Sequence, residues 1–457
     1  MANKKIVCLG GGSVFFRDTL ADLVTAEELR ESEIALYDID LERAQLMAKC
    51  GRRLSDKAGI KLKIYAADSL SKAVDGADFA IANIGGAGGK GGGYSLSNVH
   101  TNDLCISAKY GIFQVVGDTC GPAAMMAAFR TIPVYLNICR EMERRAPGAT
   151  FINHANPMAI LCRAVNKYAT LKDAIGICHG VQGGIKYAAE ILKVLPQELD
   201  TVWIGTNHYY WFTRIYRQGK DLYPELKKKM ASRKPPESNL LHAKLSQIYG
   251  YQIVYPDDSH IVEFYPFLAQ VKDGAHLPYK LAESHHGKDV TGMYALAGLG
   301  GKRSRKKEKP TTREMVMKEY RKFLNEAVLP EKPGVEALAS LIGALATGRR
   351  HIHIVNIPNK GAVPNLPGTA VLELEGVTDS CGIRAIYTGE APLVLKSLLE
   401  RIIAWQELVV DAGARGSKET ALQALSLDPT AIPPERAGAM LDELLANSKE
   451  FLPQFKI

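Results

Sequence analysis

The sequence predicts an α/β fold, in which an N-terminal Rossmann-like, doubly wound parallel sheet is followed by an α+β C-terminal domain. Short apolar runs alternate with helical patterns through roughly the first 180 residues, which is typical of parallel strands connected by helices. The first run ends in a glycine turn, and the next ends in an acidic residue. The 457 residues suffice for two or three domains, and we predict a Rossmann domain over 1–200 and an α+β domain over 201–457.

The expected strands of the first half are buried apolar runs bounded by glycine or polar turns. They are Lys5–Leu9, Ile34–Tyr37, Lys61–Ala66, Phe79–Ile84, Thr150–Asn153 and Ala174–Cys178. Ligands of such sheets bind beyond the carboxyl ends of the strands. The residues that follow each run are therefore the candidates for a functional site.

A dinucleotide-binding unit is predicted at the first of these ends. Gly10 permits the tight turn, and Gly12 lets the backbone approach a pyrophosphate at a helix N-terminus. Asp38 would accept hydrogen bonds from a ribose diol, which favours NAD over NADP. Phe15 stands where a third glycine is usual, and the alternative is an ordinary glycine turn. The predicted cofactor contacts are Gly10, Gly12, Ser13, Val14, Phe15, Asp38 and Asn153.

Three further strand ends carry polar or glycine-rich segments. The run Gly85–Tyr94 is mostly glycine and contains Lys90, so it is either an anion cradle or a solvated surface loop. Asn153–Met158 would point the amides of Asn153 and Asn156 into the crevice, with Pro157 opening a helix. Cys178 and His179 follow the last run.

The second half has fewer expected strands and several helices. Strands are expected at Thr201–Ile215, Arg350–Asn356 and Thr369–Leu374, and amphipathic helices at Leu393–Val410 and Pro433–Leu445. The basic run Gly301–Lys309 is interpreted as a solvated loop. The apolar helices near the C-terminus suggest a homodimer or homotetramer.

Composition narrows the class of protein. The chain is 46% hydrophobic and 23% charged, as folded proteins are, and its net charge of +8 is spread rather than gathered into a nucleic-acid-binding stripe. The eight cysteines form no CxxC pair, which is typical of a reducing compartment. No apolar run is long enough for a signal peptide or a membrane span. We therefore expect a cytoplasmic protein without a nucleic-acid or membrane partner.

Six motifs in order resemble glycoside hydrolase family 4, a family of NAD- and metal-dependent glycosidases with a lactate/malate dehydrogenase-like fold. They are GGGS with Asp38, NP at Asn156, CH at Cys178, NH at His208, D-x-H-x-x-E-F at Asp258, and NIPN…PNLP over Asn356–Pro367. The NPM form of the asparagine motif is similar to that of members acting on unphosphorylated sugars, including α-galactosidases and α-galacturonidases. Ala123-Ala124 depart from the family pattern, and related NAD-dependent sulfoquinovosidases remain a second possibility for the substrate.

The resemblance implies a role for individual residues. Cys178 and His208 would hold Mn²⁺ or another divalent metal, and this donor pair leaves positions open for a sugar diol. Asn156 and His179 would contact sugar hydroxyls, and Lys90 and His260 are further substrate candidates. Asp258 matches the family's acid/base aspartate, although it also suits a helix or turn cap. Asp118 is a second candidate carboxylate, and Tyr265 or another tyrosine is an alternative base.

Such a set would support hydrolysis by elimination and addition. NAD⁺ would take hydride from C3 of the sugar, and the resulting ketone acidifies the C2 proton, which a base removes. The aglycone then leaves C1, water adds to the double bond, and the reduced cofactor returns hydride to C3. An anion cradle near Lys90 would suit a uronide or a sulfoquinovoside. The alternatives are a 2-hydroxyacid dehydrogenase of the lactate/malate type and a catalytically silent NAD-binding sensor.

Overall fold

A computed structural model describes most of the chain. The described residues are 2–86, 98–114, 116–172, 174–232, 239–255, 258–266, 312–332, 334 and 337–456. The predicted loop residue Lys90, most of the glycine-rich run around it and the basic run 301–309 lie outside these residues. None of the described helices is long and apolar enough to cross a membrane.

A nine-stranded sheet forms the centre of the molecule, in the order β12-β11-β10-β6-β5-β4-β1-β2-β3. Strands β1 to β6 run parallel, as predicted, and β10 to β12 extend the sheet antiparallel beyond β6. The parallel strands are β1 (Lys5–Leu9), β2 (Glu33–Tyr37), β3 (Lys63–Ala66), β4 (Phe79–Ala82), β5 (Thr150–Asn153) and β6 (Ile175–Gly176); the added strands are β10 (His351–Pro358), β11 (Val371–Asp379) and β12 (Gly382–Ala385).

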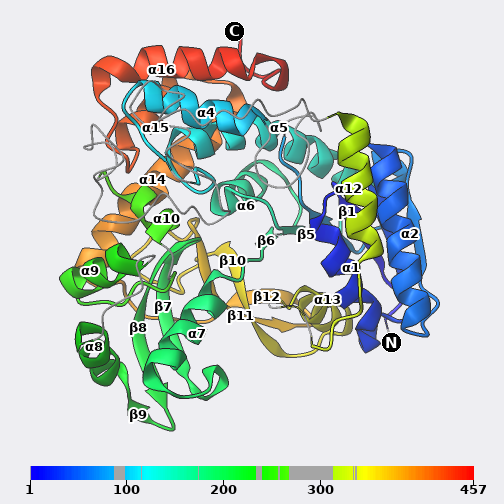
Figure 1. The fold of residues 1–457 in the computed structure, drawn as a ribbon, viewed down its shortest axis with the longest axis horizontal. Helices are drawn as coiled ribbons and strands as arrows, with labels where there is room; N and C mark the ends of the chain where they lie inside the picture. Colours follow the sequence, from blue (N-terminus) through cyan, green and yellow to red (C-terminus); the bar gives the residue numbers. More distant parts are fainter. Residues whose placement is uncertain are drawn as a thin grey trace.

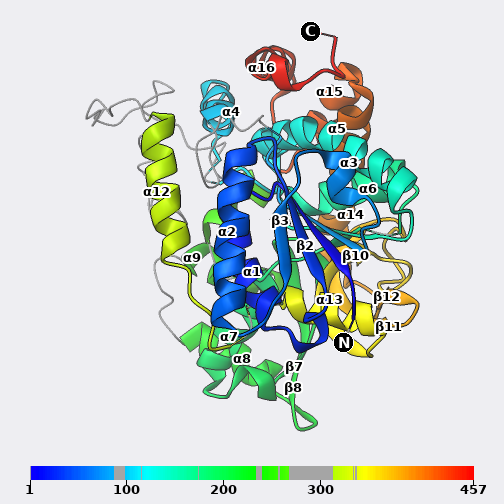
Figure 2. The same cartoon turned by 90° about the vertical axis from the view of Figure 1, so that its right-hand side faces the viewer.

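Helices cover both faces of this sheet, as a doubly wound fold requires (Figure 2). One group packs around α2 and comprises α1 (Phe15–Thr25), α2 (Leu41–Lys57), α12 (Arg313–Asn325) and α13 (Leu338–Thr347), with η1 (Glu27–Leu29) nearby. The other packs around α5 and comprises α3 (Leu70–Val74), α4 (Asn98–Lys109), α5 (Gly121–Arg145), α6 (Met158–Tyr168), α14 (Leu393–Arg415), α15 (Lys418–Leu427) and α16 (Pro434–Asn447), followed by η7 (Lys449–Phe451). Pro157 was expected at the first helical position of α6, but it is the N-cap residue, one position before the helix begins at Met158.

A second, smaller sheet lies beside the first (Figure 1). It consists of β7 (Asp200–Thr206), β8 (Tyr209–Arg217) and β9 (Lys220–Asp221), all antiparallel. The expectation of one strand over Thr201–Ile215 was wrong, because Asn207 and His208 make a hairpin turn in which His208 has a φ of 61°. This sheet packs with η2 (Pro196–Glu198) and the helices α7 (Gly180–Leu192), α8 (Tyr223–Ser232) and α9 (Leu240–Tyr249); α10 (Asp258–Ile261) and η4 (Val262–Phe264) follow.

The two halves of the chain share the large sheet. Asn356 of β10 pairs with Gly176 of β6, so strands from both sides of residue 200 belong to one hydrogen-bonded layer. The hairpin is fastened to this layer as well, since the Trp203 indole donates to the carbonyl of Glu373 (2.8 Å). The domain boundary at residue 200 stays a prediction. The shared sheet and the contact between Trp203 and Glu373 hold the hairpin turn in a fixed position relative to the carboxyl ends of β4 to β6.

Candidate functional site

The glycine turn after β1 has the close packing that a dinucleotide-binding loop requires. Gly10 has a φ of +76°, and a Cβ there would lie 2.3 Å from the carbonyl oxygen of Asn83. A Cβ on Gly12 would lie 2.7 Å from Cβ of Arg43 and 3.0 Å from Oδ2 of Asp38. Neither position has room for a side chain, so glycine lets the chain turn tightly between β1 and the helix that follows it.

Asp38 lies at the end of β2, facing this turn. Its Oδ2 accepts a hydrogen bond from the amide of Gly12 (2.9 Å), and its Oδ1 accepts one from the amide of Asp40 (2.8 Å). The carboxylate is half-buried, which leaves part of it accessible. The structure thus fits the predicted placement of an acid beside the glycine turn, as ribose recognition requires.

Polar and aromatic contacts continue the crevice from β1 towards β5. The Ser13 hydroxyl donates to Oδ1 of Asn83 (2.9 Å), and the Asn83 amide donates to the carbonyl oxygen of His154 (3.1 Å). The Phe15 ring stacks on the His154 ring at 3.6 Å between centroids. Phe15 therefore covers the turn between β5 and α6, which explains why a bulky residue stands where a third glycine is usual.

Asn153 has a different place from the one predicted. It is fully buried, with Oδ1 accepting from the Tyr135 hydroxyl (2.7 Å) and the Ala155 amide (3.0 Å), and Nδ2 donating to the Ala155 carbonyl (2.9 Å). Both polar atoms are thus used within the protein. Asn153 shapes the turn that carries Asn156 rather than pointing its amide into the crevice.

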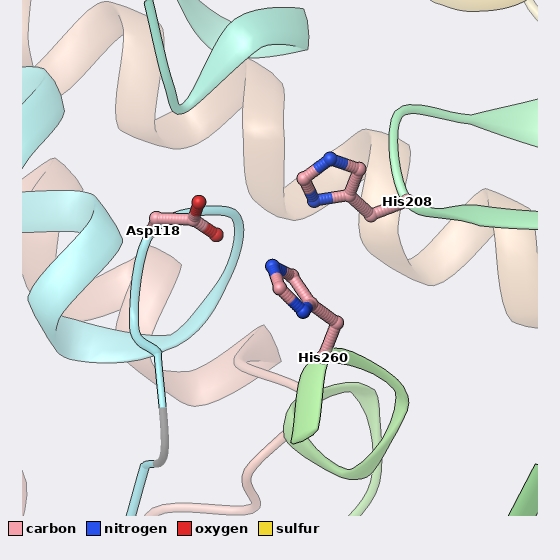
Figure 3. A group of neighbouring side chains, drawn as sticks. All are labelled: Asp118, His208 and His260. Carbon is pink, nitrogen blue, oxygen red and sulfur yellow. The ribbon is translucent and has the colours of Figure 1, made fainter. Parts of the chain in front are cut away.

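Asp118, His208 and His260 form a cluster with metal-binding geometry. One candidate ligand atom from each lies within 4.8 Å of those of the others. Figure 3 shows the three side chains converging from a loop before α5, from the hairpin turn and from α10. His208 and His260 are almost fully buried, and their rings meet nearly at right angles, 4.9 Å between centroids. A carboxylate and two imidazoles are a common donor set for divalent metals.

The predicted pair Cys178 and His208 is brought together at this cluster. Sγ of Cys178 lies 3.5 Å from Nε2 of His208. Two ligands of one ion, at about 2.3 Å for sulfur and about 2.1 Å for nitrogen, would stand roughly 3.6 Å apart at a tetrahedral angle. The separation therefore fits a shared ion, with Cys178 at the end of β6.

Hydrogen bonding fixes which nitrogen of His208 carries a proton. The Thr119 hydroxyl donates to Oδ1 of Asp118 (2.6 Å) and also lies 2.9 Å from Nδ1 of His208. A hydroxyl has one proton, so Nδ1 of His208 must donate to Thr119. Nε2, on the side of Cys178, is then the nitrogen that a metal would take, which is the arrangement of a metal-ligating histidine.

Asp118 is held in its anionic form. Burial alone would raise its pKa, but the charges of His260 and His208 and the hydrogen bonds from Thr119 and Asn156 outweigh burial and lower the pKa to about 2. The Asn156 amide donates to Oδ2 (2.7 Å). A carboxylate with so low a pKa suits a metal ligand better than a proton donor, so the structure favours this role over the predicted one. His260, expected as a substrate contact, joins the same cluster.

Asp258 and Tyr265 have contacts that differ from those of proton-transfer groups. Oδ2 and Oδ1 of Asp258 accept hydrogen bonds from the amides of Leu241 (2.8 Å) and His242 (2.7 Å), at the start of α9, so the capping alternative describes these contacts. Tyr265 packs against Tyr209 and Tyr249, and burial raises its pKa well above the usual value. That direction disfavours Tyr265 as a base at neutral pH.

The remaining predicted contacts flank the cluster. Asn156 reaches it through Asp118, as described above. His179 caps α7 and is exposed, directly after Cys178, so it is accessible to a ligand in the crevice. Lys90 lies outside the described residues.

Sequence reasoning missed two groups beside the cluster. The Tyr255 ring lies 4.8 Å from the rings of both His208 and His260, between centroids. Behind the hairpin turn, the Asn207 amide donates to Oε2 of the fully buried Glu373 (2.9 Å). Burial raises the pKa of Glu373 to about 7, against the opposing effects of Asn207, Asn356 and His179. The one signal for Glu373 in the sequence is that an acidic residue interrupts the apolar residues of β11.

The fold and the cluster together define an α/β protein with a Rossmann-type sheet and a candidate metal centre at its carboxyl edge. The chain belongs to the family 4 glycosyl hydrolases: residues 5–194 match this family, and residues 203–431 match the family 4 glycosyl hydrolase C-terminal domain. It is therefore a glycosidase, which excludes the lactate/malate-type dehydrogenase as its class. The predicted family is confirmed.

Two relatives illustrate the range of substrates. The chain is 30% identical over 461 residues to an alpha-galactosidase of Bacillus subtilis strain 168, covering 99% of this chain and 100% of the relative. It is 27% identical over 482 residues to an alpha-galacturonidase of Lachnoclostridium phytofermentans, covering 99% and 98%. Identities of this size do not select one sugar.

Solved structures confirm the fold. A putative glucosidase, lplD, from Bacillus subtilis has a TM-score of 0.79 at 26% identity and covers 97% of this chain and 100% of its own. A 6-phospho-alpha-glucosidase from gut microorganisms, in complex with NAD and Mn²⁺, has a TM-score of 0.78 at 22% identity, covering 99% and 100%. A lactate dehydrogenase from a Medee basin deep-sea metagenome library, with a TM-score of 0.54 at 14% identity, covers 91% and 100% and confirms the predicted likeness to that fold.

Proposed function

We propose that this chain hydrolyses an unphosphorylated, anionic glycoside, a uronide or a sulfoquinovoside, with NAD and a divalent metal as cofactors. The observation that supports the need for both cofactors is the arrangement of two sites along one sheet edge, whereas the substrate class follows the NPM form of the motif at Asn156 and the lysine in the glycine-rich run. The glycine turn with Asp38 follows β1 and β2, and the cluster with Cys178 follows β6. A sugar bound between them would reach both a nicotinamide and a cation.

The residues of the first site fit a dinucleotide. Gly10 and Gly12 allow the tight turn at which a pyrophosphate would bind, and Asp38, beside this turn, would accept hydrogen bonds from the adenosine ribose. When bound, NAD supplies reversible hydride transfer, which a glycosidase relying on two carboxylates does not need. Ser13, Val14 and Phe15 would line the same turn.

The residues of the second site fit a divalent cation. Asp118, His208 and His260 provide an anionic oxygen and two imidazoles, and Cys178 stands 3.5 Å from His208. Held by these residues, a divalent cation would supply positive charge that stabilises negative charge on the sugar oxygens at C2 and C3. Asn156 and His179 would orient the diol from the same edge.

Proton transfer at C2 and at the leaving oxygen requires a group beside the cluster. Asp258 was the first candidate, but both of its oxygens accept backbone hydrogen bonds. Tyr255 packs against both histidines of the cluster and is the better-placed tyrosine. We therefore propose Tyr255 ahead of Tyr265 and Asp258 as the base.

A panel of chromogenic glycosides tests the function. It should contain α- and β-anomers of galactosides, galacturonides, sulfoquinovosides and 6-phosphoglucosides, each assayed with and without NAD⁺ and Mn²⁺. We expect turnover of an anionic, unphosphorylated member only with both cofactors, with deuterium from D₂O entering C2. Equal hydrolysis after removal of NAD⁺ and chelation of metal would refute the redox cycle. Turnover of the phosphorylated or neutral sugars alone would refute the substrate assignment.

We also propose a homo-oligomer. Large apolar side chains remain exposed on the last third of the chain, including Ile352 (51%), Tyr387 (69%) and Leu393 (82%). Apolar surface of this kind is often covered by a second copy. Light scattering after size exclusion should give a mass of at least twice 49.9 kDa, and a monomer mass would refute the proposal.

A further inference from the structure

We infer that Glu263 is a positioning residue for the metal site: its carboxylate holds the loop that carries Asp118. Glu263 is 1% exposed and lies in η4, three residues after His260. The sequence motif that contains it pointed to Asp258 and His260 but gave Glu263 no role. The inference rests on the proposed function, because it assumes that a cation binds at the cluster.

Among the described residues, the carboxylate of Glu263 accepts three hydrogen bonds from the loop. Oε1 accepts from the amides of Val116 (2.6 Å) and Gly117 (2.8 Å), and Oε2 accepts from the amide of Gly117 (2.9 Å). Charge-assisted bonds of this kind are stronger than those between neutral groups. They act on the backbone directly before Asp118, so the carboxylate of Glu263 sets where that side chain begins.

The loop itself leaves little room for another position. Gly117 has a φ of +64°, and a Cβ there would lie 2.6 Å from Cδ2 of Leu104 and 2.9 Å from Cβ of Ala123. The carbonyl of Val116 lies 2.9 Å from Nε2 of the buried His100. The turn is thus held by His100 on one side and by Glu263 on the other. Glu263 belongs to the segment Asp258–Phe264, which also carries His260.

The same segment reaches the other two cluster residues. His260 lies on α10, directly before η4, and Phe264 stacks on Tyr209 at 4.2 Å between centroids with an interplanar angle of 8°. Tyr209 follows His208 in the chain. Glu263 therefore connects the loop of Asp118 to a segment that carries His260 and packs beside His208, and its bonds position Asp118 relative to the two histidines.

Mn²⁺ affinity of the NAD⁺-loaded protein, measured by titration calorimetry, tests the inference. Glu263→Gln places an amide N–H against the Gly117 N–H, and Glu263→Asp keeps the charge but withdraws it by one methylene. Each should weaken Mn²⁺ binding about tenfold or more while leaving NAD⁺ affinity unchanged. Asp22→Asn is the matched control. Asp22 lies on α1, and its carboxylate also accepts a hydrogen bond from a backbone amide, that of Gly334 (3.0 Å). This substitution should not change Mn²⁺ affinity.

A double-mutant cycle separates positioning from a general effect of charge. If Glu263 acts through Asp118, Glu263→Gln should add nothing to the loss caused by Asp118→Asn. Additive losses, or wild-type Mn²⁺ affinity in Glu263→Asp, would overturn the inference. Absence of Mn²⁺ binding in the wild-type protein would instead refute the proposed metal site, so the two failures are distinguishable.

Discussion

Replacing Glu373 with glutamine should remove a pH dependence from the stability of this protein. Glu373 is fully buried on β11, beside Asn356 of β10 and under the turn that carries His208. Burial raises its pKa from 4.5 to about 7, and the contacts with Asn207 and Asn356 and the charge of His179 only partly oppose this. At low pH the folded chain therefore holds a protonated acid at this position.

The direction and size of the effect follow from the two pKa values. In the unfolded chain Glu373 ionises near 4.5, whereas in the folded chain it ionises near 7. Its contribution to stability is complete below pH 4.5, decreases as the pH rises, and is lost above pH 7. At about 1.4 kcal/mol per pKa unit the total is on the order of 3 kcal/mol, of which about 2–3 kcal/mol falls between pH 5 and pH 8.

Urea unfolding of the cofactor-free protein at several pH values measures this loss. Glu373→Gln keeps an oxygen that can accept from Asn207 but does not titrate. Its stability relative to the wild type should rise by about 2–3 kcal/mol from pH 5 to pH 8. Glu326→Gln, at an exposed position, is the control and should follow the wild-type profile. Parallel profiles for Glu373→Gln and the wild type would refute the reasoning, since Glu373 would then ionise alike in both states.

Three other substitutions distinguish the roles assigned to single residues. Cys178→Ala should lower Mn²⁺ affinity at least tenfold and abolish turnover while calorimetry shows unchanged NAD⁺ binding; full activity after chelation would contradict the metal role. Asp38→Ala should weaken NAD⁺ binding about tenfold with Mn²⁺ affinity unchanged, and equal NAD⁺ affinity would contradict ribose recognition. Asp258→Asn should cost about 1–2 kcal/mol of stability in thermal unfolding, with kcat within tenfold of the wild type; a loss of a thousandfold or more in kcat at unchanged Mn²⁺ affinity would restore Asp258 as the acid.

Local patterns carried most of the fold and part of the site. The strand β1, the glycine turn and Asp38 lie within 34 residues, and their order alone predicted the first crevice. Cys178 follows a predicted strand and His208 belongs to a family motif, and the structure brings the two side chains within 3.5 Å of each other. The hairpin turn was missed although Thr206, Asn207 and His208 interrupt the apolar pattern, because only Asn207 and His208 separate β7 from β8.

The partners of Asp118 and Glu373 could not be read from the sequence. Asp118 meets His208 and His260 across separations of about 90 and 140 residues, and no periodicity encodes such a meeting. The burial that raises the pKa of Glu373 depends on how the hairpin packs on β11. Contacts of this kind follow from the packing of whole elements, so sequence reasoning could name the residue types but not the pairs.

The segment Asp258–Phe264 illustrates why activity alone cannot assign the acid. Asp258 holds the start of α9, His260 joins the cluster, Glu263 holds the loop of Asp118 and Phe264 stacks beside His208 on Tyr209. Each of these positions contacts or carries part of the support of a candidate metal ligand, so lowered turnover in a variant does not by itself show that the residue transfers a proton. An inactive variant in this segment identifies the acid only when its Mn²⁺ affinity equals that of the wild type. Metal affinity and kcat must therefore be measured on the same variants, and the position where they separate marks the proton-transfer group.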